Sequence, residues 1–227
     1  MYAAKWAEAS VSDIFTEVDE EVRREQLKKL WERYGNYVIA AAFAVILGVA
    51  AYRGYEWWQN KKATEAGAAY DAAAQLAEAG KHEEAEAAFG KLTTEGTAGY
   101  RILARLRQAA EIAERDPTAA VAAYDAIARD NAGEPLVGEL AAVRAAFLLV
   151  DTAKLDEMVQ RLDPVTQPKG TFRHTARELL ALSAWHNGDA GATRRWTDAA
   201  KSDPEAPPAL RSRMEVLTTL LPEAGKP

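Results

Sequence analysis

The sequence predicts an all-α protein in which one membrane-spanning helix precedes an array of stacked helix pairs. Three observations lead to this prediction. Residues 34–52 form a run of nineteen residues without a charged side chain. The chain after this run has no alternating strand pattern, and Ala, Leu, Glu and Arg recur there at helical spacing. The same part of the chain also repeats its apolar pattern at a nearly constant period, which is typical of stacked helix pairs.

Residues 1–33 are expected to form a cytoplasmic segment with an amphipathic helix over residues 10–33. Phe15, Val18 and Val22 begin an apolar stripe that continues, after a shift in phase, through Leu27 and Leu30. Acidic residues crowd the beginning of the segment and basic residues its end, which suits a helix dipole. Two interpretations stay open: the helix lies on lipid headgroups or extends the spanning helix, or it docks a cytoplasmic or membrane partner.

Residues 34–58 are expected to be a transmembrane signal anchor. As a helix, the uncharged run measures about 28 Å, close to the hydrocarbon thickness of a bilayer. Aromatic side chains of the kind that gather at the membrane–water interface lie at both ends. They are Trp31, Tyr34 and Tyr37 around its start, and Tyr52, Tyr55, Trp57 and Trp58 around its end. A buried core helix rarely carries such residues at both ends, and a cleavage site typical of a signal peptide is missing.

Positive charges around the run predict its orientation. Five basic residues precede it closely (Arg23, Arg24, Lys28, Lys29, Arg33), and three follow it (Arg53, Lys61, Lys62). Because cytoplasmic flanks carry the excess of Lys and Arg, the N-terminus is expected in the cytoplasm. The protein is then expected to be a single-pass membrane protein whose C-terminal domain lies across the membrane, which is the periplasm if the membrane is a bacterial inner membrane.

Residues 59–227 are expected to form one helical repeat domain. Gly, Pro, Asn and Asp interrupt the helical pattern at regular intervals. The predicted helices cover 57–79, 82–94, 97–114, 117–130, 135–150, 153–162, 171–187, 190–201 and 207–220. The last of them would cap the array.

The second helix of each pair can be aligned with the others. A residue that is small in three copies, a bulky residue four positions later and a small or aliphatic residue three positions further recur at offsets of 35, 35 and 37. The four copies are Ala85, Phe89, Leu92; Ala120, Tyr124, Ile127; Leu155, Val159, Leu162; and Ala192, Trp196, Ala199. This spacing is close to the tetratricopeptide period of about 34 residues. The sequence therefore predicts a tetratricopeptide-like α-solenoid of about four helix pairs plus a capping helix.

Composition excludes several classes of function. The net charge of −6 leaves no basic surplus to neutralise nucleic-acid phosphates, so a nucleic-acid partner is not expected. The chain contains no cysteine, which removes disulfides, thiolate nucleophiles and sulfur-ligated zinc. Hydrophobic residues at 48% and charged residues at 27% are ordinary values for a folded domain.

Catalytic patterns are also missing from the sequence. The three histidines, His82, His174 and His186, have no metal-ligand spacing, and His82 is expected to be solvated at a turn. No nucleophile elbow or phosphate-binding glycine loop is present. We therefore expect no enzyme, no cofactor, no metal and no small-molecule substrate. The alternative, a small enzyme or sensor, would require a pocket with convergent polar groups.

Arginines on the first helices of successive pairs form a candidate partner groove. They are Arg101, Arg105, Arg144, Arg173 and Arg177. First helices usually line the concave surface of such arrays, where bidentate guanidinium groups bind acidic or extended polypeptide segments. The alternative is that these arginines lie on the surface and pair with Glu111, Glu139 or Glu178. Trp185 and Trp196 are expected in the core.

The order of these segments resembles the YfgM-type ancillary subunit of the bacterial Sec translocon. The resemblance rests on Ile46-Leu47-Gly48-Val49 running to Tyr55-Glu56-Trp57-Trp58, on Ala69-Tyr70 with Gly80-Lys81, and on Gly188-Asp189, Ala192, Trp196 and Lys201-Ser202-Asp203. The opening Ser-Asp-Ile-Phe-x-Glu-Val-Asp-Glu is similar to alphaproteobacterial relatives. This resemblance implies a membrane-anchored protein-interaction module whose partners are the bilayer, the Sec translocon, secreted polypeptides or periplasmic chaperones. The alternative is a scaffold or assembly factor for another envelope complex.

Overall fold

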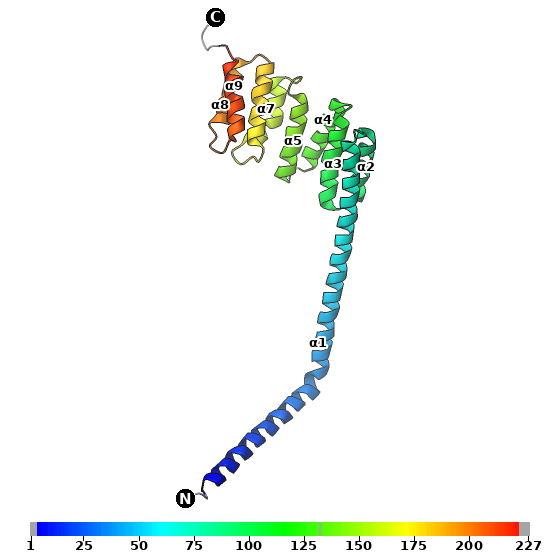
Figure 1. The fold of residues 1–227 in the computed structure, drawn as a ribbon, viewed down its shortest axis with the longest axis vertical. Coiled ribbons are helices and arrows are strands. Elements are labelled where there is room, and N and C mark those ends of the chain that lie inside the picture. Colours follow the sequence, from blue (N-terminus) through cyan, green and yellow to red (C-terminus); the bar gives the residue numbers. More distant parts are fainter. Residues whose placement is uncertain (1–3, 132, 223–227) are drawn as a thin grey trace. The chain divides into compact units, whose positions relative to one another are not determined.

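The computed structural model describes residues 4–131 and 133–222, with side chains from residue 23 onward. These residues form nine α-helices and one short 3₁₀ helix, and they contain no strand (Figure 1). The helices are α1 Ala4–Glu78, α2 His82–Glu95, α3 Ala98–Ala113, α4 Pro117–Asp130, α5 Pro135–Leu149, α6 Leu155–Leu162, η1 Asp163–Thr166, α7 Arg173–His186, α8 Ala190–Lys201 and α9 Pro208–Thr219. The all-α prediction is confirmed, and every predicted helix after the first lies within two residues of its observed bounds.

The chain divides into two compact units, residues 1–61 and 62–227. The first unit consists of the greater part of α1, which begins at Ala4 instead of residue 10. Phe15, Val18 and Val22 lie outside the described side chains. Residues 36–55 are all exposed, so they do not pack in a core of the described chain. This part of α1 is long and apolar enough to cross a membrane.

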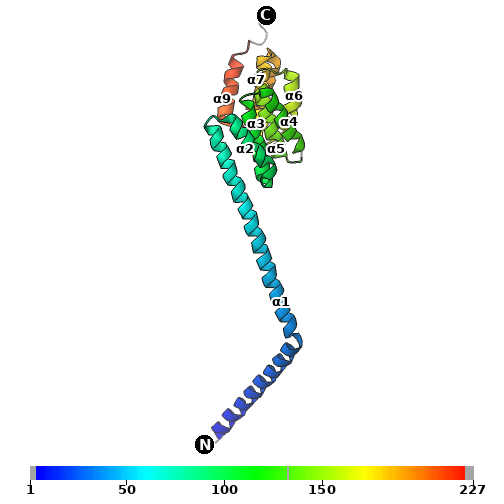
Figure 2. The same cartoon turned by 90° about the vertical axis from the view of Figure 1, so that its right-hand side faces the viewer.

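The second unit is a linear stack of helices, in which each core is shared by helices adjacent in the chain. Four clusters of buried residues follow one another: α1 to α3, α3 to α5, α5 to α7, and α7 to α9. Figures 1 and 2 show these helices following each other in chain order, from cyan to red. A core built only between neighbours is the arrangement of a repeat protein.

The buried positions of the second helices repeat regularly when they are numbered from the N-cap residue of each helix. The caps of α2, α4, α6 and α8 are Lys81, Asp116, Lys154 and Asp189. The residues four, eight and eleven positions later are all 5% exposed or less. They are Ala85, Phe89, Leu92; Ala120, Tyr124, Ile127; Met158, Leu162, Val165; and Thr193, Thr197, Ala200.

The predicted register is therefore right in the first two copies and wrong in the last two. In the third copy it is displaced by three residues, because the caps of α4 and α6 are 38 residues apart where the other successive caps are 35 apart. Met158, not Leu155, takes the first buried position. In the fourth copy the displacement is one residue, so Thr197 lies in the core and its neighbour Trp196 is only half-buried.

Two hairpins close through the same glycine turn. Gly80 and Gly188 have φ values of +74° and +75°, a conformation that other residues rarely adopt. In each turn the next residue, Lys81 or Asp189, donates its N–H to the carbonyl five residues earlier, at 2.9 Å. This Schellman pattern satisfies the last carbonyls of α1 and α7 and reverses the chain into α2 and α8.

Candidate functional site

The exposed large apolar side chains of the second unit lie on particular helices of the pairs. Among the described residues they are Leu103 on α3, Leu136 and Phe147 on α5, Trp185 on α7, Val216 on α9 and Leu220 directly after α9. The second helices, α2, α4, α6 and α8, carry none. Large apolar side chains are thus exposed on the first helices and around α9 and not on the second helices, which indicates a surface that meets another molecule.

Helix α5 carries the longest part of this surface. Leu136, Leu140, Arg144 and Phe147 follow each other at spacings of four, four and three, so they lie on one side of the helix. Leu136 is 58% exposed and Phe147 65%. The other sides of α5 supply Ala141 and Ala145 to one core cluster and Val143 and Ala146 to the next. We call the exposed side, Leu136, Leu140, Arg144 and Phe147, the α5 face.

Arg144 brings a positive charge to the α5 face. It is exposed, and no ion pair joins it to another described residue. Burial raises the pKa of the Tyr124 phenol, and the charges of Arg144 and Arg107 oppose that rise. The charge of Glu111 acts on the same phenol in the opposite sense, so Arg144 lies in a region that also holds the Arg107–Glu111 pair.

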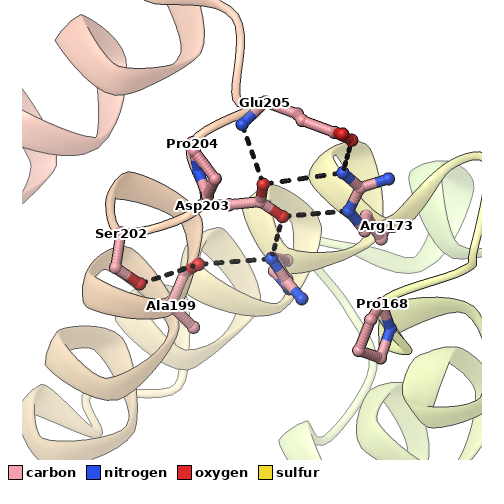
Figure 3. A pocket seen from close by; sticks show the side chains of 8 residues that line it. Pro168, Arg173, Ala199, Ser202, Asp203, Pro204 and Glu205 are labelled. Carbon is pink, nitrogen blue, oxygen red and sulfur yellow. Dashed lines mark hydrogen bonds and ion pairs between the residues drawn. The ribbon is translucent and has the colours of Figure 1, made fainter.

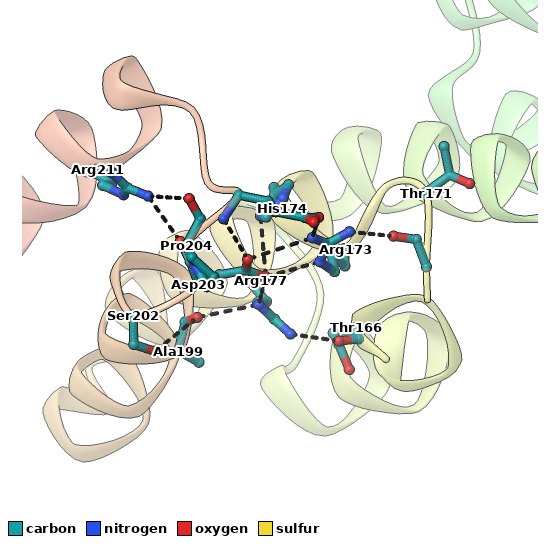
Figure 4. Close-up of polar contacts among 12 residues, drawn as sticks. Thr166, Thr171, Arg173, His174, Arg177, Ala199, Ser202, Asp203, Pro204 and Arg211 are labelled. Atoms are coloured by element: carbon teal, nitrogen blue, oxygen red, sulfur yellow. Dashed lines mark hydrogen bonds and ion pairs between the residues drawn. The ribbon is translucent and has the colours of Figure 1, made fainter. Parts of the chain in front are cut away.

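Arg173 (Figure 3) and Arg177 (Figure 4), also predicted for the groove, are engaged inside the protein. Arg173 Nε donates to Asp203 Oδ2 at 2.9 Å, and Arg177 Nη1 donates to the same oxygen at 2.8 Å. Arg173 also pairs with Glu205. Arg177 reaches the Thr166 carbonyl at 3.0 Å (Figure 4). The two arginine side chains are only 13% and 14% exposed, so both guanidinium groups bind the chain itself.

Asp203 is the centre of this cluster. The hydrogen bond from Arg173 holds the pKa of the Asp203 carboxyl well below its ordinary value, and burial opposes the shift. The Glu205 N–H, 3.0 Å from Asp203 Oδ1, and Arg177 lower it further. A cavity of about 490 Å³ opens beside these groups, and Pro168 and Ala199 lie in its wall. Its charged groups pair with each other, which joins α7 to the chain after α8.

The structure does not bring the five predicted groove arginines together. Arg105 Nη2 donates to Asp130 at 2.6 Å, and Arg101 Nη1 donates to the Gly96 carbonyl at 3.3 Å. Of the five, Arg144 is the one on the α5 face. A partner groove over all five stays a prediction.

The predicted pairing of these arginines with Glu111, Glu139 and Glu178 is wrong. Glu111 lies 2.8 Å from His82 Nδ1 and 3.8 Å from Arg107. Glu139 accepts the backbone N–H groups of Thr171 and Phe172, and Glu178 binds Arg213 in a bidentate pair. Each of these three carboxylates is bound by a group other than the five predicted arginines.

The aromatic residues predicted for the membrane interface are all exposed. They are Trp31, Tyr34, Tyr37, Tyr52, Tyr55, Trp57 and Trp58. Lys61 Nζ lies 5.6 Å from the centre of the Trp57 ring, and the Arg33 guanidinium lies 5.6 Å from that of Tyr34. Basic groups thus accompany the rings at both borders, as they would at headgroups. Their place in a membrane stays a prediction.

Comparison with known families decides the identity of the fold. A family model described as a tetratricopeptide repeat-like domain matches residues 28–202, which is more than half of the chain. This protein belongs to the tetratricopeptide repeat-like family. The searches of curated proteins and of solved structures gave no match. The match begins in α1 ahead of the apolar run and ends just after α8.

Tetratricopeptide repeat-like domains are typically non-enzymatic interaction modules, and no catalytic arrangement was found among the described residues. His82 is partly solvated, with 40% of its side chain exposed, and it also pairs with the buried Glu111. His174 is largely buried, which lowers its pKa, and the charge of Arg173 lowers it further. His186 is exposed, 3.9 Å from Asp151. The described part of the chain holds no group of three or more His, Asp or Glu suited to a metal.

Sequence reasoning missed the apolar part of this tetratricopeptide repeat-like surface. The signal was present: residues 136–149 carry only Glu139 and Arg144 as charged side chains. A helix that is apolar on all sides must expose apolar surface when it lies in a stack of helix pairs. The prediction that Trp185 is buried is wrong, since it is 46% exposed. Ala181 and Ala184 take the core positions of that turn of α7.

Proposed function

We propose that this protein is a single-pass protein of the bacterial inner membrane, ancillary to the Sec translocon. Its tetratricopeptide repeat-like array is a protein-interaction module. The observation that carries the proposal is the exposure of large apolar side chains on the first helices and around α9 and not on the second helices, on an array whose chain begins with a membrane-length apolar helix. A large exposed Phe is most stable when a partner covers it.

In this proposal, residues 1–33 are cytoplasmic, residues 34–58 cross the bilayer and residues 59–227 form the periplasmic domain. The uncharged, exposed run in α1 supports the crossing, and the excess of basic residues before it supports the orientation. Anchoring raises the concentration of the array beside a membrane complex, so that weak contacts suffice for binding.

The resemblance to YfgM-type subunits supports the translocon as this complex. Secreted polypeptides leaving the translocon and periplasmic chaperones would then reach the exposed first-helix surface. A scaffold or assembly factor for another envelope complex would use the same surface with other partners. The identity of the bound partner therefore distinguishes the two functions.

Photo-crosslinking in intact cells tests the function. A benzoylphenylalanine residue replaces Phe147 on the α5 face, and a second variant carries it at Ala122, an exposed residue of α4. We expect translocon subunits or secreted chains in crosslinks from position 147 and not from position 122. Crosslinks confined to another envelope complex would support the scaffold function. Equal products from both positions would contradict a role for this surface.

Protease accessibility tests the arrangement in the membrane. The array should be cleaved in spheroplasts and protected in inverted vesicles, with the opposite result for an epitope at the N-terminus. Recovery of the intact chain in the soluble fraction would contradict the anchor.

A further inference from the structure

The α5 face combines two features that rarely occur together on a solvated helix. Phe147 is 65% exposed, and Arg144, one turn before it, has no acidic partner among the described residues. Leu140 lies one turn before Arg144. An arginine between large apolar residues is the composition found at the energetic centre of many protein interfaces.

Several other arginines of the array are neutralised by the chain itself. Arg105 binds Asp130, Arg161 binds Asp125, and Arg213 binds Glu178. Arg173 and Arg177 share Asp203. Arg144 differs from these because no ion pair within the described chain compensates its charge. A carboxylate from another molecule would give Arg144 the ion pair that these other arginines form within the chain.

We propose that the α5 face binds a short polypeptide segment in which a carboxylate lies next to a large apolar side chain. The carboxylate binds the Arg144 guanidinium, in the bidentate geometry that arginine favours. The apolar side chain packs on Phe147 and Leu140. This inference rests on the proposed function, because it assigns the chemistry of the partner to the surface that the function uses.

The surroundings favour a polypeptide over a small molecule or a lipid surface. Arg144 and Phe147 are exposed, and neither lines the cavity of about 490 Å³ beside Asp203 or the one of the same volume beside Arg161. Glu134 and Asp151, at the two ends of α5, are exposed acids, and the single Arg144 between them does not give the basic surplus that an anionic membrane attracts. An extended or helical peptide can bind through the α5 face alone.

Binding of labelled peptides to the full chain in nanodiscs of neutral lipid tests the proposal. The probe is a fluorescent peptide that alternates aspartate with leucine and phenylalanine. Two further peptides carry asparagine or lysine in place of aspartate. We expect the aspartate peptide to bind best. Arg144→Glu and Phe147→Ser should each weaken binding of the aspartate peptide by about tenfold. Arg144→Glu should in addition bind the lysine peptide more tightly than the unaltered chain does.

Two matched variants serve as controls. Arg195→Glu removes an exposed arginine from α8, and Ala122→Ser alters an exposed residue of α4, a helix outside the proposed surface. Both should bind the aspartate peptide as the unaltered chain does. Circular dichroism checks that every variant is folded.

The outcomes separate this inference from the proposed function. Equal binding of all three peptides, or unchanged binding by Arg144→Glu, overturns the acidic specificity and leaves an apolar interaction surface. Absence of binding by every peptide, together with absence of crosslinks from position 147, overturns both. If sedimentation shows that Phe147→Ser dissociates a dimer of the unaltered chain, a second copy is the occupant and the proposal is wrong.

Discussion

Arg144 on α5 and the pair Arg173 and Arg177 on α7 differ in one respect that decides their roles. The α7 pair has an acid within reach: Asp203 lies in the chain after α8 and accepts hydrogen bonds from both. Arg144 has none among the described residues and stays exposed. The same residue type on equivalent helices thus stabilises the fold in one place and is left for a partner in the other. The predictions below test this comparison.

The largest effect is expected at the Asp203 cluster. Asp203→Asn leaves two largely buried guanidinium groups without a carboxylate, which is strongly destabilising. We expect the Tm of the array to fall by about 5 °C in calorimetry. Asp198→Asn, which alters an exposed acid of α8, is the control and should leave the Tm unchanged. An unaltered Tm in Asp203→Asn would end the distinction between the two regions.

The Asp203 cluster should also make stability depend on pH. Its carboxyl has a lowered pKa in the folded protein, so unfolding raises its affinity for protons. The stabilisation is complete above the ordinary carboxyl pKa of about 3.9 and is lost as the pH falls towards the folded pKa. Urea unfolding at a series of pH values should therefore show a shallower acid decline in Asp203→Asn. If stability falls equally with decreasing pH in the unaltered chain and in Asp203→Asn, the Asp203 cluster is not the cause of the acid decline.

A medium effect is expected where α5 supports α7. Glu139 accepts the N–H groups of Thr171 and Phe172, just before α7 begins. Glu139→Ala removes this acceptor and should lower the free energy of unfolding by about 1 kcal/mol. The partly buried side of α5 would then be structural while its exposed face is not. No change in urea unfolding would mean that water replaces the carboxylate without loss.

The smallest effect is expected at Arg144. Arg144→Ala removes an exposed side chain without an ion pair in the described chain, so the free energy of unfolding should change by less than about 0.5 kcal/mol. The same urea titration measures it. A larger loss would assign Arg144 to the fold and remove the contrast with Arg173.

Local signals in the sequence were sufficient for the helices. Gly80, Gly188, Asp116 and Asp189 mark chain reversals and caps whose geometry depends on neighbouring residues only, and the structure confirms these boundaries. The neighbour-to-neighbour repeat is equally local, so the first two copies could be aligned correctly. The longer spacing between the caps of α4 and α6 has no equally clear signal, and the register failed there.

The pairing of charges could not be predicted in the same way. Asp203 lies 30 residues from Arg173 along the chain, and Glu111 lies 29 from His82. Such distances are bridged only after the helices have packed, and many acids compete for each arginine. The same limit applies to Trp185, whose exposure depends on which neighbouring alanines fill the core.

The position of α5 in the stack gives its exposed face one further property. Ala141 and Ala145 close the core shared with α3 and α4, while Val143 and Ala146 close the core shared with α6 and α7. Any transient separation of the stack into halves must pass through this helix. A ligand bound along α5 would slow hydrogen exchange in both halves at once. Binding at one helix would therefore stabilise much of the array against local opening.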